Sequence, residues 1–307
     1  MRVAAIDVGT NSTRLLVAEE QPGGFRSIDR RMVITRLGQG VDRRRILAPE
    51  ALKRTLATIA DYAAACGDLG VERLRVTGTS AVRDAHNRGE FMNAVKLLTG
   101  AEPELLSGEL EARATYLGAV SDLDSGQPVL VVDIGGGSTE LIHGREEPER
   151  LVSLDVGSVR MFEKHLVSDP PTPAELEALR AEVGAALDEA KPSLEVPPGT
   201  RMVGVAGTVT QLAAIHAGVA VYDPDVTHHA ILSHGDVRRL ARRLGILPYE
   251  QRKKVKALVP GRADVIVAGA EILLSVMEAF DAPEVLTSEK DILDGLVMGL
   301  LTNHTRS

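Results

Sequence analysis

The sequence predicts an α/β protein of two domains with the same architecture, and three observations support this. The chain has 307 residues, about twice the usual length of one domain. Apolar stretches of strand length alternate with stretches of helical periodicity. The segments DVGTNST (Asp7–Thr13) and DIGGGST (Asp133–Thr139) share the frame Asp, aliphatic, Gly, two variable residues, Ser, Thr, each between two apolar strands. Two copies of one supersecondary unit indicate a duplicated fold.

The first half is expected to open with a β-hairpin on a glycine turn. In order, the predicted elements are strands Arg2–Val8 and Thr13–Ala18, helix Pro49–Cys66, a strand around Leu74–Val76, and helices near Asn87–Leu98 and Gly108–Val120. The polar, turn-rich segment Ser121–Pro128 is the candidate boundary. We therefore place the first domain at 1–124 and the second at 125–307, with a last helix, 290–302, that packs back on the first domain.

The second half restarts with a strand, a glycine turn and a strand over Val129–Ile142. A helix start is clearly marked by Thr172 as N-cap, Pro173 at the first helical position and Glu175 completing a capping box. Further predicted elements are a strand at Met202–Val205 that leads through Gly207 into a helix, a long helix at Arg262–Phe280 and a last one at Ile292–Leu301.

Composition excludes several classes of protein. Hydrophobic residues make up 44% and charged residues 25%, which is ordinary for a folded globular chain. We expect a cytoplasmic protein without a membrane span, because no apolar run approaches about 18 residues and Asp7 interrupts any signal peptide. The single cysteine, Cys66, allows no internal disulfide. The net charge of −8 argues against a nucleic-acid binder.

The two glycine turns are candidate phosphate sites. Backbone N–H groups of Gly135, Gly136, Gly137 and Ser138 can converge on an anion, and Gly9, Thr10, Asn11 and Ser12 can do the same in the first copy. One such turn alone fits a plain hairpin equally well. Two copies, each after a strand-terminal Asp, favour phosphate binding. Neither a P-loop nor a Rossmann fingerprint is present.

Carboxylates accompany both turns. Asp133 and Glu140 lie on the two arms of the second hairpin, and Asp7 occupies the matching place in the first. Carboxylates beside phosphate need a cation that neutralises both, and Mg²⁺ or Mn²⁺ suits such oxygen ligands. For Glu140 alone, a solvated strand residue is the plainer interpretation.

Two glutamates compete for the role of a general base. Glu109 and Glu111 flank an apolar stripe of Leu110, Ala114 and Leu117, and helical periodicity does not choose between them. The plainer interpretation of both is a favourable acidic residue at a helix N-terminus. Arg83, one turn into the segment GTSAVRDAHN, could clamp a phosphate oxygen, although an arginine at such a place is more often a surface charge.

The remaining charged clusters have plainer interpretations. The arginine runs at Arg43–Arg45, Arg238–Arg243 and Arg252–Lys256 are expected to be solvated faces rather than binding grooves. His228, His229 and His234 lie close in sequence without metal-ligand spacing, so we interpret them as structural or exposed.

Together, these segments resemble the exopolyphosphatase and guanosine pentaphosphate phosphohydrolase family, within the actin-like superfold. The matching motifs, from Asp7 to Gly269, are DVGTNSTRLLV, GTSAVRDAHN, LLSGELEARATYLGA, DIGGGSTEL, SLDVGSVRMFE, GVAGTVTQLAA and GRADVIVAG. The resemblance implies two actin-like (ribonuclease H-like) domains with mixed sheets flanked by helices, and an active-site cleft between them. It also implies hydrolysis of terminal phosphoanhydride bonds of inorganic polyphosphate by in-line attack of water.

The resemblance also assigns residues to roles. It implies Glu111 as the catalytic base, Asp133 and Glu140 as Mg²⁺ ligands, both glycine turns and Arg83 as phosphate contacts, and a further contact at Gly207 and Thr208. Many members have a glycine where this chain has Arg43–Arg45, and long members carry an additional C-terminal helical region. We therefore expect a short member of the family that favours short polyphosphates and releases intermediates of degradation. We also expect the chain to form a homodimer. Guanosine pentaphosphate hydrolysis, a non-catalytic alarmone sensor and a kinase of the same superfold are the alternatives.

Overall fold

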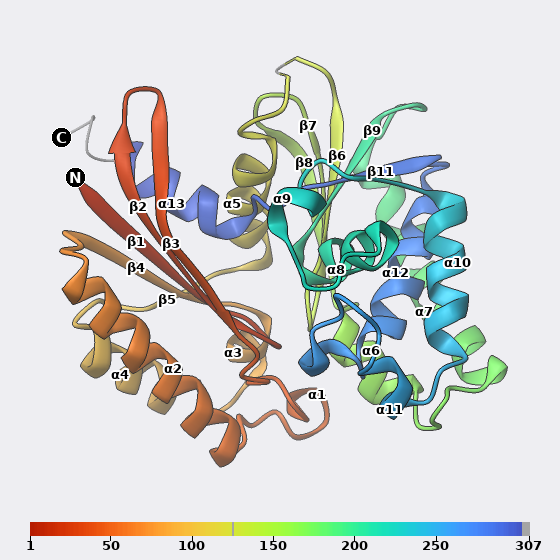
Figure 1. Cartoon of the computed structure of the whole chain (residues 1–307), viewed down its shortest axis with the longest axis horizontal. Helices are drawn as coiled ribbons and strands as arrows, with labels where there is room; N and C mark the ends of the chain where they lie inside the picture. The colour runs from red at the N-terminus through yellow and green to blue at the C-terminus, as the bar shows by residue number, and fades with distance from the viewer. Residues whose placement is uncertain (125, 303–307) are drawn as a thin grey trace. The chain divides into compact units, whose positions relative to one another are not determined.

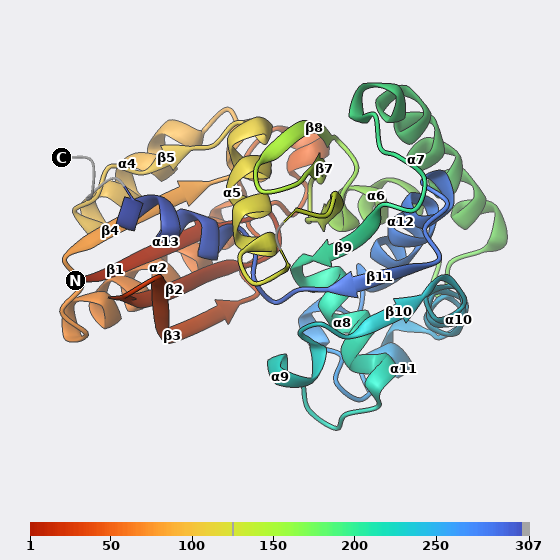
Figure 2. The same cartoon turned by 90° about the horizontal axis from the view of Figure 1, so that it is seen from above.

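The computed structural model describes residues 1–124 and 126–302. It contains two compact units. Unit 1 comprises Met1–Gly118 together with the chain from Asp291 onward, and unit 2 comprises Ala119–Lys290. The chain therefore leaves unit 1 after Gly118 and returns to it at Asp291. Figures 1 and 2 show the elements of each unit.

Unit 1 is a five-stranded mixed sheet with helices on both faces. Its elements are β1 (Arg2–Val8), β2 (Thr13–Gln21), β3 (Gly24–Val33), α1 (Val41–Arg44), α2 (Pro49–Asp68), β4 (Arg73–Gly78), α3 (Ser80–Asp84), α4 (Arg88–Thr99), β5 (Glu104–Leu105), α5 (Gly108–Val120) and α13 (Ile292–Thr302). The strand order is β3-β2-β1-β4-β5. Strands β1 to β3 pair antiparallel, and β4 and β5 continue the sheet parallel to β1.

Strand β1 shows how one sheet supports two layers of helices. Its side chains alternate between the faces because successive residues of a strand point in opposite directions. Ala4, Ile6 and Val8 pack in one cluster with residues of α2 and α4. Val3 and Ala5 pack in the other with residues of α13. Figure 1 shows α2 and α4 on one side of this sheet and α13 on the other.

Unit 2 repeats the same plan in a six-stranded sheet. Its elements are β6 (Val129–Ile134), β7 (Thr139–Gly144), β8 (Pro148–Leu154), α6 (Ser158–His165), α7 (Pro173–Leu194), β9 (Arg201–Val205), α8 (Ala206–Ala217), α9 (Pro224–Thr227), β10 (Ile231–Ser233), α10 (His234–Gly245), α11 (Tyr249–Arg252), a 3₁₀ turn at Pro260–Arg262, α12 (Ile266–Ala279) and β11 (Glu284–Thr287). The order β8-β7-β6-β9-β11-β10 matches unit 1 strand for strand through β9. The predicted fold class, α/β with two mixed sheets flanked by helices, is confirmed.

The predicted elements differ from the structure in several local details. Strand β3 was not predicted, because it is an edge strand whose residues are mostly exposed and charged and carry little apolar signal. The helix predicted from Arg262 begins at Ile266, because Pro260–Arg262 forms a separate 3₁₀ turn. The same helix was predicted to end at Phe280, but its last helical residue is Ala279.

The predicted buried stripe of α5 is wrong at Leu110, whereas Ala114 packs against the core. Leu110 is 53% exposed, whereas Ala112 and Tyr116 are fully buried. Glu111 lies on this buried side of the helix and is only 9% exposed. Periodicity misplaced the face because it weighs only apolar residues, and here a carboxylate shares the buried face.

None of the helices in the described part of the chain is long and apolar enough to span a membrane.

Candidate phosphate and metal sites of the two units

In unit 1, the candidate residues gather where strands end. Parallel β1 and β4 are in register, with Val8 beside Gly78, and β5 extends the same edge with Leu105 beside Gly78. The turn after β1, helix α3 after β4 and the approach to α5 after β5 therefore leave one edge of the sheet. The carboxyl ends of parallel strands are the usual place for ligand sites in α/β folds.

The first glycine turn points its amides in one direction. It closes with a hydrogen bond of 3.0 Å from Gly9 N–H to Ser12 O, and the carbonyls of Thr10 and Asn11 accept bonds from backbone N–H groups of segment 36–38. In a trans peptide the N–H points opposite to the carbonyl before it. The N–H groups of Asn11 and Ser12 therefore point away from that segment. The buried Asn11 Nδ2 has no hydrogen-bond partner among the described residues, so it is available to donate to a bound anion.

The second glycine turn has the same closure. Gly135 N–H donates to Ser138 O at 3.0 Å. The carbonyls of Gly135, Gly136 and Gly137 accept bonds from residues 158–160 at the start of α6. By the same argument, the N–H groups of residues 136–138 point away from α6. Three parallel donors make this turn the stronger anion nest, that is, a concavity lined by backbone N–H groups.

The two hairpins differ in the residue opposite the strand-terminal Asp. In the first, Asp7 pairs across the strands with Arg14, whose Nη2 lies 2.7 Å from Asp7 Oδ2. In the second, Asp133 pairs with Glu140. Directly opposed residues project from the same face of a sheet and interact, and like charges there are destabilising. In the first hairpin an arginine faces the Asp, whereas in the second two carboxylates face each other, an arrangement that a divalent cation would stabilise.

The second hairpin fits a hard divalent metal ion. Asp133 and Glu140 are 7% and 1% exposed, and Glu140 Oε1 accepts a hydrogen bond of 2.7 Å from Ser153 Oγ. That bond orients the carboxylate from outside the candidate site, as outer partners of metal ligands commonly do. Two buried carboxylates on one face supply the oxygen donors that Mg²⁺ or Mn²⁺ prefers.

Asp7 differs from Asp133 in its charged neighbour, because it pairs with an arginine rather than facing a second carboxylate. Burial raises the pKa of its carboxyl, and the charge and hydrogen bond of Arg14 oppose that shift. Arg14 also pairs with Asp291. Because Asp7 already has a cationic partner in Arg14, the structure supports a metal at Asp133 and Glu140 more strongly than one at Asp7.

The structure separates the two candidate glutamates. Glu111 Oε2 accepts a hydrogen bond of 2.8 Å from Arg83 Nη1, which also donates to the carbonyl of Leu106 at 2.8 Å. The Glu109 side chain is 61% exposed and forms a surface pair with Arg113. Glu111 and Arg83 thus form a partly buried pair beside the strand ends, and Glu109 lies outside it.

The glycine turn at the start of α8 lies against an arginine that the sequence did not single out. Val205 ends β9 beside Asp133 of β6, so Gly207 and Thr208 follow the same edge of the sheet. A Cβ at Gly207 would lie 2.0 Å from Arg262 Nη1, so only glycine lets this guanidinium approach the turn. Arg262 belongs to the motif GRADVIVAG, and an arginine directly after its first glycine is the signal that could have pointed to it.

The charged clusters are mostly solvated. Arg43, Arg44 and Arg45 are exposed, as are the four arginines of α10. Arg252 is an exception: it is 3% exposed, donates to Asp169 at 3.1 Å and so is a structural residue. The interpretation of the histidines was incomplete, because His228 contacts Asp122, 106 residues away.

Paired glycine turns at strand ends, one beside opposed carboxylates, are typical of enzymes that act on phosphate groups. Comparisons with known proteins define the class further.

The chain belongs to the Ppx/GppA phosphatase family, whose profile matches residues 16–304. It is 40% identical to Exopolyphosphatase 2 of Mycobacterium tuberculosis over 97% of this chain and 98% of that protein. It is 28% identical to a guanosine-5'-triphosphate,3'-diphosphate pyrophosphatase of Photobacterium profundum, over 97% of this chain and 59% of that protein. A crystal structure of an Aquifex aeolicus family member matches with a TM-score of 0.85 and 31% identity, over 100% of this chain and 99% of that one.

Proposed function

We propose that the chain hydrolyses terminal phosphoanhydride bonds of inorganic polyphosphate and releases orthophosphate. The observation that carries the proposal is the second hairpin, where an anion nest at residues 135–138 directly joins the opposed carboxylates of Asp133 and Glu140. A phosphate and a divalent cation would bind there side by side. The choice of polyphosphate is supported by the 40% identity to Exopolyphosphatase 2 over nearly the whole chain.

In this proposal Glu111 is the catalytic base. It takes a proton from the attacking water, and the 2.8 Å bond from Arg83 orients its carboxylate. The N–H groups of residues 11–12 and 136–138 in the two turns hold phosphate oxygens, and these donors need no reorientation as charge develops. Arg83 contacts the phosphate chain with its remaining guanidinium N–H groups.

The metal is assigned to unit 2. Asp133 and Glu140 would hold Mg²⁺ or Mn²⁺, with Asp7 as the least supported candidate ligand because it pairs with Arg14. When bound, the ion neutralises phosphate charge and polarises the bond that breaks. Gly207, Thr208 and the neighbouring Arg262 would contact further phosphate oxygens.

Guanosine pentaphosphate is the second candidate substrate. Its support is the 28% identity to the guanosine-5'-triphosphate,3'-diphosphate pyrophosphatase of Photobacterium profundum, whose name specifies this nucleotide. Because this identity is lower than the 40% to Exopolyphosphatase 2, guanosine pentaphosphate is the less supported of the two substrates.

Phosphate release without any acceptor tests the proposal. Purified chain is incubated with polyphosphates of graded length, and separately with guanosine pentaphosphate, each with Mg²⁺ and with excess chelator. We expect Mg²⁺-dependent orthophosphate from polyphosphate, with short chains used at least as well as long ones and intermediates visible on a gel. Release only when a phosphoryl acceptor is added would indicate a kinase. Tight binding of the nucleotide without any release would indicate a sensor.

A further inference from the structure

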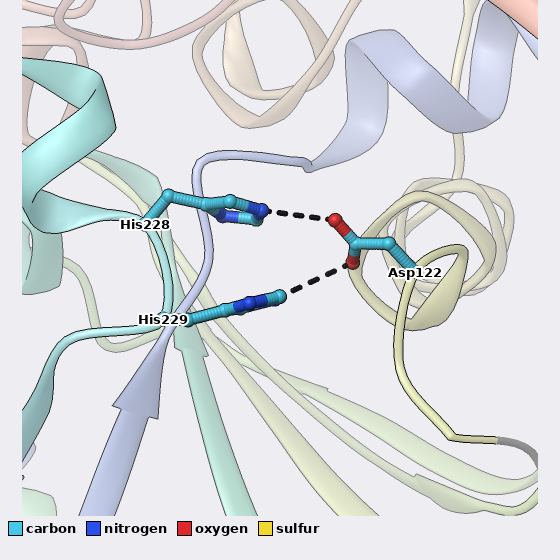
Figure 3. A group of neighbouring side chains, drawn as sticks. All are labelled: Asp122, His228 and His229. Carbon is cyan, nitrogen blue, oxygen red and sulfur yellow. Dashed lines mark hydrogen bonds and ion pairs between the residues drawn. The ribbon is translucent and has the colours of Figure 1, made fainter.

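Three side chains of unit 2 meet outside the candidate phosphate site. Asp122 follows α5, and His228 and His229 lie between α9 and β10. His228 Nε2 is 2.9 Å from Asp122 Oδ2, and His229 Nε2 is 3.6 Å from Asp122 Oδ1. Figure 3 shows the carboxylate facing both rings. One ligand atom from each residue lies within 4.8 Å of the other two.

The backbone holds the two rings together. His229 adopts a left-handed conformation with φ +60°, which histidine tolerates better than most residues. Its N–H donates to Thr287 O at 2.7 Å. The two rings stack with their centroids 3.9 Å apart and their planes 27° from parallel. Neighbouring residues thus present both Nε2 atoms to one carboxylate without any rearrangement of the chain.

The carboxylate is suited to a cation. Burial alone would raise the pKa of Asp122, but hydrogen bonds from Lys290 and His228 hold it below its ordinary value. Lys290 Nζ lies 3.1 Å from Asp122 Oδ2, so a positive group already sits at this carboxylate. The side chains of Asp122, His228 and His229 are 25%, 27% and 41% exposed, which leaves them accessible to an ion from solvent.

We propose that Asp122, His228 and His229 form a binding site for a borderline divalent transition-metal ion of the Zn²⁺ class. Zn²⁺ binds imidazole nitrogen and carboxylate oxygen at about 2.0–2.2 Å, so tetrahedral neighbours lie roughly 3.4 Å apart. The separations of 2.9 and 3.6 Å bracket that value. Two nitrogens and one oxygen select such ions over Mg²⁺, which prefers oxygen. No residue of this site belongs to the proposed magnesium site.

Two groups compete with the ion. Lys290 must leave Asp122. His228 Nδ1 accepts a hydrogen bond of 3.2 Å from Glu289 N–H, so the ring proton is on Nε2 in the metal-free protein. Binding through Nε2 moves that proton to Nδ1 and breaks the bond from Glu289. The site should therefore be reversible rather than structural, and removal of the Lys290 ammonium should strengthen it.

The proposed metal site lies where the chain enters and leaves unit 2. Asp122 is three residues beyond Ala119, the first residue of unit 2, and Lys290 is its last residue. A bound ion would fix the segment by which the chain enters unit 2 to the loop after α9.

Metal binding to the full, tag-free chain tests the proposal. Zn²⁺ is titrated in competition with a chromophoric chelator, and Cu²⁺ is added separately for electron paramagnetic resonance. We expect one Zn²⁺ per chain, undisturbed by millimolar Mg²⁺, and hyperfine coupling of Cu²⁺ to two imidazole nitrogens. Asp122→Ala, His228→Ala and His229→Ala should each weaken binding roughly tenfold or more. His86→Ala, an exposed histidine of unit 1, is the matched control and should change nothing, and Lys290→Met should tighten binding.

Some outcomes would overturn the proposal. These are the absence of stoichiometric Zn²⁺ binding, a Zn²⁺ affinity of all three ligand variants equal to that of the unaltered chain, or copper spectra without coupled nitrogens. Circular dichroism and the thermal midpoint of each variant show whether it is folded. A variant that does not fold is replaced by His229→Gln, which keeps a side chain at this position and removes the imidazole.

Discussion

The substitution Glu111→Gln tests the proposed base most directly. Glutamine keeps nearly the same shape, and its amide oxygen can still accept the 2.8 Å bond from Arg83. The change therefore removes the proton acceptor while it preserves the buried contact. General bases contribute about 10²- to 10⁴-fold, which corresponds to roughly 2.7–5.5 kcal/mol of activation free energy. We expect kcat to fall by that factor and KM to stay almost unchanged, because the lost interaction acts in the transition state.

The assay is orthophosphate release from a short polyphosphate at saturating Mg²⁺. Glu109→Gln is the matched control on the same helix. Its carboxylate is 61% exposed and pairs with Arg113 on the surface, where such pairs contribute at most about 1 kcal/mol to stability. We expect its turnover to remain normal. Near-normal turnover of Glu111→Gln, or an equal loss in Glu109→Gln, would refute the assignment of Glu111.

Four further predictions rest on individual contacts. Glu140→Gln should raise the Mg²⁺ concentration for half-maximal phosphate release roughly tenfold, since a charged oxygen ligand is lost; activity that persists in excess chelator would contradict this. Gly207→Ala should displace Arg262 and raise KM about tenfold or more by loss of a charged hydrogen bond, with little change in the thermal midpoint; an unchanged KM would remove Arg262 from the substrate site. Thr172→Ala should lower the free energy of unfolding by about 1 kcal/mol in urea titrations. The capping bonds from Thr172 and Ser168 lower the pKa of Glu175 to about 2 from 4.5, so its stabilisation is present above pH 4.5 and disappears as the pH falls through 2. Denaturation at several pH values, compared with Glu175→Gln, measures this dependence.

Local patterns determined the elements that depend on neighbouring residues. The capping box of Thr172 and Glu175 is confirmed at the start of α7, because its bonds join residues three positions apart. The two glycine hairpins are confirmed for the same reason, with the closing bond of 3.0 Å in each. Strand β3 escaped prediction because its pairing with β2, and not its own composition, holds it in the sheet.

Burial of polar groups is not readable from apolar periodicity. On α5 the pattern pointed to Leu110, but the helix buries Glu111 instead. A carboxylate can occupy a buried face when a cation such as Arg83 meets it there. The choice between Glu109 and Glu111 therefore needed either a family resemblance or the packed structure.

By itself, the sequence determined the α/β class, the duplication, the glycine turns and the acidic residues beside them, because each is written in a short stretch of chain. Only the tertiary structure decided which groups from distant stretches meet. It opposed Glu140 to Asp133 but Arg14 to Asp7, set Arg262 against Gly207, and brought Asp122 to His228 across 106 residues. Such contacts depend on how sheets and helices pack, and no spacing within one segment encodes them.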